Sequence, residues 1–160
     1  DQESPSAALF RAQFGAGPVV IGPPVPDLLS AARSAQAAVA GLHACRARTA
    51  LPRPVLASDL LPERAIDGDL SARLQLVEQI YTPLVEAGGA LVETLGAYLE
   101  QSGSLEATGR ALYVHPNTVR YRLRRVTEVT TYSATDPRDA FTLHLALVLG
   151  RLADIAHVPT

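Results

Sequence analysis

The sequence predicts a mostly helical protein, with a four-helix C-terminal domain preceded by a small α/β segment and a linking helix. From residue 90 onward, apolar residues recur at helical spacing and are divided into segments by cap and breaker residues. Residues 17–22 instead form a short β-branched run bounded by glycine and proline. Hydrophobic residues make up 48% of the 160 residues and charged residues 19%, a composition that can bury a core.

The N-terminal third is expected to contain a strand, a helix and a second strand. The run 17–22 predicts the first strand, and a proline-rich loop follows it. Asp27 is expected to cap an alanine-rich helix that runs to about Arg48. The apolar residues on one face of that helix are Leu28, Ala32, Ala35 and Val39. Residues 54–57 are a candidate edge strand, and Ser58 opens a short helix.

A further helix is predicted over residues 69–81. Its apolar residues lie four, three, four and three positions apart, a two-heptad stripe formed by Leu70, Leu74, Val77, Tyr81 and Leu84. The stripe favours packing on a neighbouring helix, and a short dimerising coiled coil is the alternative. Pro83 is expected to interrupt the helix, with Thr82 capping a new segment that ends at Gly88.

Four helices are expected in the C-terminal domain. Ser102-Gly103 ends the first helix, whose apolar face holds Leu91, Leu95, Tyr98 and Leu99. Ser104 caps the second helix, residues 105–112. Asp136-Pro137 begins the fourth, with Asp139 placed to complete a capping box. The expected buried stripe of this last helix is Phe141, Leu145, Val148, Leu149 and Leu152.

The third helix of this domain, residues 116–130, combines an apolar seam with a polar strip. At about 100° per residue, Leu123 and Val126 fall within about 40° of Val119. The residues opposite the seam are Asn117, Tyr121, Arg124 and Glu128, and those on its shoulders are Thr118, Arg120 and Arg125. Amide and guanidinium groups match base edges in the DNA major groove, and other arginines bind phosphates. An ordinary solvated arginine-rich face is the alternative.

For two further residues of this region, the sequence leaves two alternative roles open. His115 precedes Pro116 at the cap position, where it either contacts phosphate or packs in the turn. Arg122 lies about 60° from the core direction, so it either reaches DNA or pairs with an acid such as Glu106.

The preceding helix favours a helix-turn-helix, because two helices that cross closely need a small residue where they touch. Gly109 supplies that residue, and the apolar positions around it are Leu112, Val114, Val119 and Leu123. Tyr113 stands at the turn position where glycine is commoner. Charge agrees with this reading: residues 103–132 carry five arginines against two glutamates, whereas the rest has nine arginines against fourteen acids.

Residues 94–149 resemble the C-terminal helix-turn-helix domain of the PucR/CdaR family of bacterial transcriptional regulators. The resemblance is carried by Thr94-Leu-Gly-Ala-Tyr-Leu99, by the stretch from Leu112 to Val126 with its His-Pro-Asn-Thr-Val-Arg-Tyr-Arg-Leu core, and by Asp136-Pro137. The domain also resembles Fis-like helix-turn-helix modules. The PucR/CdaR family often has glycine just after the recognition helix, where this chain has Thr131.

The resemblance implies three regions: residues 1–62 as the end of a degenerate GGDEF-like domain, 63–89 as a linker helix, and 90–156 as the DNA-binding domain. The expected partner is double-stranded DNA, with the helix of residues 116–130 in the major groove. Asn117, Tyr121 and Arg124 are then the expected base-edge contacts, and Thr118, Arg120 and Arg125 the phosphate contacts. A homo-oligomer is expected. The sequence does not begin with Met and is interpreted as a piece of a longer protein. Any effector ligand is expected to bind upstream of this piece.

Other functions have less support. No catalytic motif is present, so we expect no enzymatic activity, and no GGDEF signature supports nucleotide cyclisation. We expect no cofactor and no metal, because His43 and Cys45 are two ligands where a site needs three or four. No membrane helix or signal peptide is apparent, which predicts a cytoplasmic protein. The competing hypothesis is a helical protein-interaction module with a solvated arginine-rich face.

Overall fold

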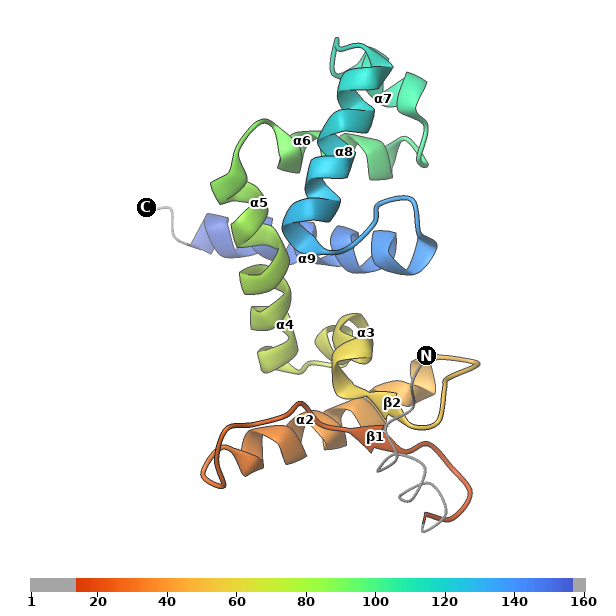
Figure 1. Cartoon of the computed structure of the whole chain (residues 1–160), viewed down its shortest axis with the longest axis vertical. Helices are drawn as coiled ribbons and strands as arrows, with labels where there is room; N and C mark the ends of the chain where they lie inside the picture. Colours follow the sequence, from red (N-terminus) through yellow and green to blue (C-terminus); the bar gives the residue numbers. More distant parts are fainter. Residues whose placement is uncertain (1–13, 157–160) are drawn as a thin grey trace. The chain divides into compact units, whose positions relative to one another are not determined.

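The computed structural model describes residues 14–156 and confirms a mostly helical fold (Figure 1). The N-terminal residues, in which the sequence shows no signal peptide, fall within residues 1–13, and the structure does not describe these residues. Contacts divide the chain into an N-terminal unit that ends at Ala72 and a C-terminal unit that begins at Arg73. Within the described residues, no helix has the length and apolar character that crossing a bilayer requires.

The N-terminal unit contains a two-stranded parallel sheet. Its elements are β1 (Val20–Ile21), α2 (Ala31–Ala44), a 3-10 turn (Cys45–Ala47), β2 (Val55–Leu56), a second 3-10 turn (Ala57–Leu60) and α3 (Leu61–Ile66). Val20 lies opposite Val55, and Ile21 opposite Leu56. Both predicted strands are therefore confirmed, and α2 forms the crossover that parallel pairing requires.

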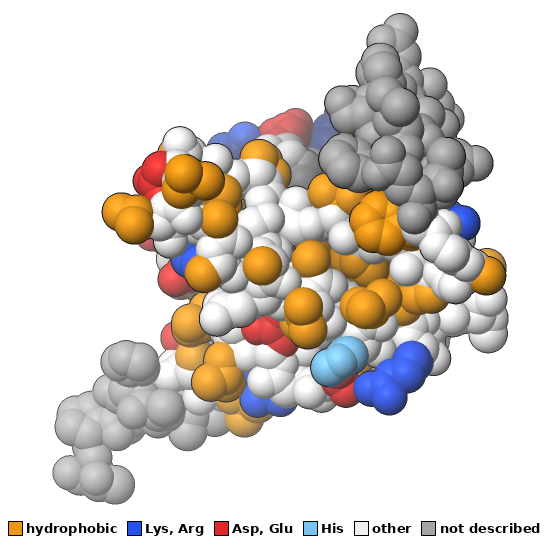
Figure 2. Space-filling model, turned by 90° about the horizontal axis from the view of Figure 1, so that it is seen from below, with side chains coloured by type: hydrophobic (Ala, Val, Ile, Leu, Met, Phe, Trp, Pro, Cys, Tyr) orange, Lys and Arg blue, Asp and Glu red, His pale blue; other side chains and the backbone are white. Residues whose placement is uncertain are grey.

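The predicted apolar face of α2 is the wrong face. Leu28 is 92% exposed and Val39 is 56% exposed, whereas the buried residues of the helix are the small ones, Ala37, Gly41 and Ala44. A Cβ atom at Gly41 would lie 2.8 Å from Val20 Cγ1, so the helix can approach β1 only along this small-residue face. The larger side chains consequently remain on the surface, and Figure 2 shows hydrophobic side chains spread over this side of the molecule.

The start of α2 also differs from the prediction. Asp27 Oδ1 accepts a hydrogen bond from the Ser30 N–H at 2.8 Å, and the helix begins one residue later, at Ala31. Asp27 therefore stabilises the turn that leads into the helix and is not the cap itself.

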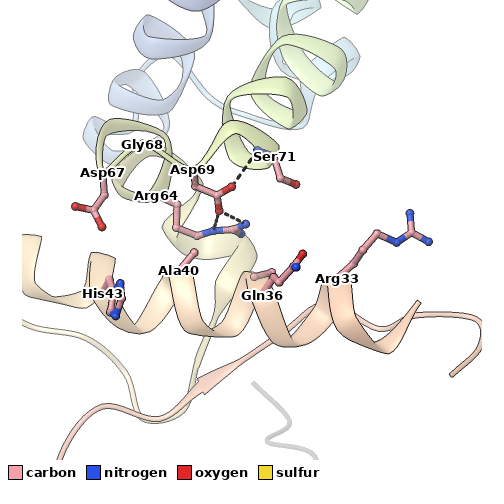
Figure 3. A pocket seen from close by; sticks show the side chains of 10 residues that line it. Arg33, Gln36, Ala40, His43, Arg64, Asp67, Gly68, Asp69 and Ser71 are labelled. Carbon is pink, nitrogen blue, oxygen red and sulfur yellow. Dashed lines mark hydrogen bonds and ion pairs between the residues drawn. The ribbon is translucent and has the colours of Figure 1, made fainter. Parts of the chain in front are cut away.

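A buried ion pair closes the end of the N-terminal unit. Arg64 is only 2% exposed, and its Nε and Nη2 atoms donate to Asp69 Oδ2 at 3.0 and 2.7 Å. Its Nη1 donates to the Ala57 carbonyl at 2.9 Å. Asp69 Oδ1 accepts from the N–H groups of Ser71 and Ala72 at the start of α4. Figure 3 shows this pair beside α2, at a cavity of about 430 Å³.

At Pro83 the predicted interruption is not a break in the helix, whereas the predicted new segment from Thr82 and its end at Gly88 are confirmed. The structure instead has α4 (Leu70–Leu76), a π-helical turn (Val77–Tyr81) and α5 (Thr82–Ala87) in direct succession. The Thr82 N–H donates to the Val77 carbonyl, five residues back. This wider turn lies just before Pro83, which lacks an N–H and would crowd the carbonyl four residues earlier in a regular α-helix. Leu70 and Leu74 of the predicted stripe are exposed, while Tyr81 and Leu84 are buried.

The helices of the C-terminal unit are α6 (Leu91–Glu100), α7 (Leu105–Ala111), α8 (Pro116–Thr130) and α9 (Pro137–Ala156). Figure 1 shows α7 beside the start of α8, with α9 at the opposite end of α8. The Ser104 cap is confirmed, because its Oγ accepts from the Ala107 N–H at 3.2 Å. Asp136 also acts as predicted, accepting from the N–H groups of Arg138 and Asp139. Asp139 does not close a capping box but accepts from the Ser133 N–H.

The buried face of α9 is not the predicted stripe. Phe141, Val148 and Leu152 are 45%, 40% and 60% exposed. The buried residues are Thr142, Leu143, Ala146, Leu147 and Gly150. This face is selected by Tyr81, whose ring packs directly on Gly150 and whose hydroxyl donates to Asp154. The hydrogen bond to Asp154 raises the pKa of Tyr81, and burial of the ring acts in the same direction.

Candidate nucleic-acid interface

The apolar seam of α8 is confirmed and holds the helix in the C-terminal unit. Val119 and Val126 are fully buried and Leu123 is 7% exposed. Helix α8 packs against α5, α6 and α7 through this side. Burial of each such side chain stabilises the fold by about 1.5 to 3 kcal/mol. The seam therefore fixes which face of α8 points outward.

The helix-turn-helix depends on a close approach at Gly109. A Cβ atom there would lie 2.8 Å from the Val114 carbonyl oxygen and 3.4 Å from the Pro116 nitrogen. The Gly109 carbonyl accepts from the Val114 N–H at 2.9 Å, which closes the turn. The small residue predicted at this position is confirmed, and it contacts the backbone of the turn that starts α8.

Replacing Gly109 with leucine is expected to destabilise the domain. The added side chain meets backbone atoms that cannot rotate away, so overpacking should cost about 1 to 3 kcal/mol. Urea unfolding followed by circular dichroism measures the loss. Ala111 in the same helix is exposed, and Ala111→Leu is the matched control, expected to change stability little. Equal stability of the two variants would contradict the close approach at Gly109.

The outward strip of α8 lies where the periodicity predicted it. Asn117, Tyr121, Arg124 and Glu128 are all exposed, Tyr121 by 69% and Glu128 by 53%. Among residues 14–156, neither the Arg124 guanidinium nor the Tyr121 hydroxyl has a hydrogen-bond or ionic partner. Both groups are therefore available to an external ligand. Guanidinium and phenol groups suit base edges and phosphate oxygens.

The start of α8 is organised by two side-chain hydrogen bonds. His115 is the cap residue, and its Nδ1 accepts from the Asn117 N–H at 3.1 Å. A neutral ring that accepts at Nδ1 carries its proton on Nε2, so the exposed nitrogen is a donor. The Arg120 Nη1 donates to Asn117 Oδ1 at 2.5 Å. This pairing uses the Asn117 oxygen, and among residues 14–156 the amide nitrogen of this exposed side chain has no hydrogen-bond partner.

The shoulder residues of α8 separate into two groups. Thr118 is half-buried and Arg120 is exposed beside the outward strip, and Arg125 forms a surface ion pair with Glu128 at 2.9 Å. Arg122 instead turns inward: it is half-buried and its Nη1 donates at 3.0 Å to the hydroxyl of Thr94, a fully buried residue of α6. The structure thus shows Thr94, not Glu106, as the partner of Arg122.

Two residues beside α8 have left-handed backbone conformations. Tyr113 in the turn has φ 55°, and Thr131 after the last helical residue has φ 66°. Thr131 stands where the helix ends, a place for which glycine is well suited. Tyr113 is 96% exposed, and the hydrophobic periodicity of the sequence did not identify it as a functional residue. The signal that identifies it is a non-glycine residue at a turn position that requires a positive φ.

Candidate metal ligands do not gather at this surface among the described residues. Within the part of the chain that the structure describes, no group of three or more His, Cys, Asp or Glu residues is arranged to hold a metal ion. The thiol of Cys45 is buried, and this burial raises its pKa.

Comparison with known proteins agrees with this geometry. Residues 91–149 match the PucR C-terminal helix-turn-helix domain. The C-terminal unit therefore contains a PucR-type helix-turn-helix domain. The purine catabolism regulatory protein of Bacillus subtilis is 43% identical over 63 residues, which cover 39% of this chain and 12% of that protein. This domain is thus homologous to the helix-turn-helix domain of PucR-type regulators.

Two similarities extend beyond the PucR-type domain. An uncharacterised protein of Mycobacterium tuberculosis is 51% identical over 154 residues, which cover 94% of this chain and 37% of that protein. The crystal structure of a regulator of polyketide synthase expression from Bifidobacterium adolescentis superposes with a TM-score of 0.85 at 36% identity, covering 96% of this chain and 62% of that chain. The chain thus spans little more than a third of the length of that mycobacterial relative.

Proposed function

We propose that this chain is part of a sequence-specific DNA-binding transcriptional regulator whose helix α8 enters the major groove. The observation that carries the proposal is the outward strip of α8, where the Tyr121 hydroxyl and the Arg124 guanidinium have no partner among residues 14–156 and the buried seam holds the helix in place. Asn117, Tyr121 and Arg124 contact base edges in this proposal. The phosphate contacts come from His115, Thr118, Arg120 and Arg125. Arg122, bonded to Thr94, positions the helix from its inner side.

The homologues support the regulatory part of the proposal, because those with a named role are regulators. The charge distribution supports the DNA-binding part. Five of the arginines lie in residues 103–132, so a chain of net charge −2 presents a local positive surface within a Debye length of roughly 8 to 10 Å.

Selection of bound genomic fragments with the full-length protein identifies the preferred site, and Arg124→Ala then tests the proposed reading helix. The substitution should weaken binding to the preferred site by about 1 to 3 kcal/mol, with a smaller loss on random DNA, because a base contact is lost. Arg46→Ala, which removes an exposed arginine from the N-terminal unit, is the matched control and should bind like the parent. Equal losses on both duplexes would make Arg124 a backbone contact, and no loss would refute its role.

We propose that the functional form is a dimer or higher oligomer. A single α8 reads few base pairs, and each correct contact contributes about 1 to 3 kcal/mol against roughly 10⁶ or more competing genomic sites. Two copies on half-sites about one helical turn apart supply the missing specificity. Light-scattering mass across a concentration series, with footprinting on the preferred site, measures the stoichiometry. One protein copy per site would contradict the proposal.

We infer the same division of the chain as the resemblance implies: the end of a degenerate GGDEF-like domain over residues 1–62, a linker helix over 63–89 and the DNA-binding domain over 90–156. The parallel β1–α2–β2 arrangement supports an α/β origin for the first region. Its sheet has two short strands, and large side chains on α2 are exposed, as expected for part of a larger α/β domain.

A helical protein-interaction module is the second candidate function. The exposed side chains Phe141, Val148 and Leu152 on α9 favour it, because apolar groups along one helix face suit a protein partner. Salt dependence separates the two functions. DNA binding through several phosphates weakens steeply as salt rises, whereas an apolar protein contact does not.

A further inference from the structure

The strongest unassigned feature of the C-terminal unit is Tyr113, in the turn between α7 and α8. Its side chain is 96% exposed, and within residues 14–156 its hydroxyl has no hydrogen-bond partner. Its backbone has φ 55°, in the left-handed region that favours glycine. A large aromatic residue therefore occupies a strained position without any packing that would offset the strain.

The turn that carries Tyr113 is held in one conformation. The Tyr113 N–H donates to the Arg110 carbonyl at 3.3 Å, and the next N–H, that of Val114, donates to the Gly109 carbonyl at 2.9 Å. The strain therefore belongs to an ordered turn and not to a loose loop. Residues held in sparsely populated backbone conformations concentrate at ligand-binding sites, where their position serves the ligand.

Its place in the helix-turn-helix indicates which ligand this is. In this motif the first helix crosses the DNA backbone and the N-terminal residues of the second contact base edges. The connecting turn therefore adjoins the sugar-phosphate backbone at the edge of the groove. Tyrosine hydroxyls are among the groups that bind phosphate oxygens in protein–DNA complexes. A neutral donor at this position adds affinity without reading sequence.

We propose that the Tyr113 hydroxyl donates a hydrogen bond to a phosphate oxygen of the bound DNA duplex. The proposal rests on the proposed function of α8 as the DNA-reading helix. It extends the contact surface beyond α8 to the turn before it. The left-handed conformation holds the side chain out in solvent before DNA arrives, so little side-chain ordering remains to be done on binding.

Three variants test the contact, with Thr131 as the matched reference because it has the same backbone conformation after the other end of α8. Tyr113→Phe should weaken binding roughly threefold to tenfold, the value of one hydrogen bond. The loss should be equal on the preferred site and on random duplex, and the salt dependence should not change, because no charge is removed. Tyr113→Gly should bind at least as weakly, yet melt roughly 2 to 4 °C higher as the strain is relieved.

Thr131→Gly should also melt at a higher temperature but bind DNA like the parent. Failure of the parent to bind any duplex would refute the proposed function itself. If the parent binds and both Tyr113 variants bind equally well, only the Tyr113 contact is refuted. Weaker binding by Tyr113→Gly alone would replace the hydroxyl contact with one made by the ring. A loss confined to the preferred site would make Tyr113 a base contact, which also overturns the phosphate assignment.

Discussion

Substitution of Asp69 by alanine is expected to destabilise the N-terminal unit by about 3 to 5 kcal/mol, because it leaves a buried guanidinium without its counter-charge. Arg64 is 2% exposed and donates two of its hydrogen bonds to Asp69. The same change removes the acceptor for the first N–H groups of α4, and a lost cap costs about 1 kcal/mol more. Urea unfolding monitored by circular dichroism measures the effect.

Asp67→Ala is the matched control for this prediction. Asp67 is an exposed carboxylate two residues earlier in the same connection, at the rim of the cavity in Figure 3. It should change stability by less than about 0.5 kcal/mol, as surface substitutions usually do. If the two variants unfold at the same urea concentration, the Arg64–Asp69 pair does not stabilise this unit.

Gly150→Ala is expected to lower the stability of the C-terminal unit by about 2 to 5 kcal/mol. The added methyl group would overlap the Tyr81 ring at three of its atoms, and displacement of the ring would also break the hydrogen bond to Asp154. Helix propensity alone predicts the opposite sign, because alanine is about 1 kcal/mol better than glycine in a helix interior. The sign of the measured change therefore separates packing from propensity.

A second variant assigns the cause to the ring. In a Tyr81→Leu background the aromatic ring is absent, so the cost of Gly150→Ala should fall to a fraction of its value in the parent. A double-mutant cycle with thermal or urea unfolding gives the coupling energy. Additive effects of the two substitutions would show that the Tyr81 ring is not what limits residue 150.

Elements with strong local signals could be predicted from the sequence. The β-branched run gave β1, and the caps Ser104 and Asp136 gave the starts of α7 and α9. The seam of α8 was also predictable, because its apolar residues are few and lie on one side. These features depend on residues close together in the chain, so their physical causes are visible in a short window.

Features that depend on distant partners could not be predicted. Helix α9 has two apolar faces, and periodicity alone cannot decide between Phe141 and Leu143 as the buried side. The choice depends on the fit between Gly150 and Tyr81, which are far apart in sequence. The orientation of Arg122 likewise depends on Thr94, 28 residues away. Small-residue contacts of this kind decide the packing but leave no hydrophobic pattern.

The hydrogen bond between Arg120 and Asn117 makes these two positions one unit of specificity in the proposed complex. Asparagine reads adenine with both its oxygen and its amide nitrogen, so the base either shares the Asn117 oxygen with Arg120 or displaces Arg120 from it. A substitution at either position changes the free state of the other. A single substitution at residue 117 or residue 120 is therefore not expected to change the base preference of this helix cleanly. Regulators that acquire a new operator through this surface should change residues 117 and 120 together.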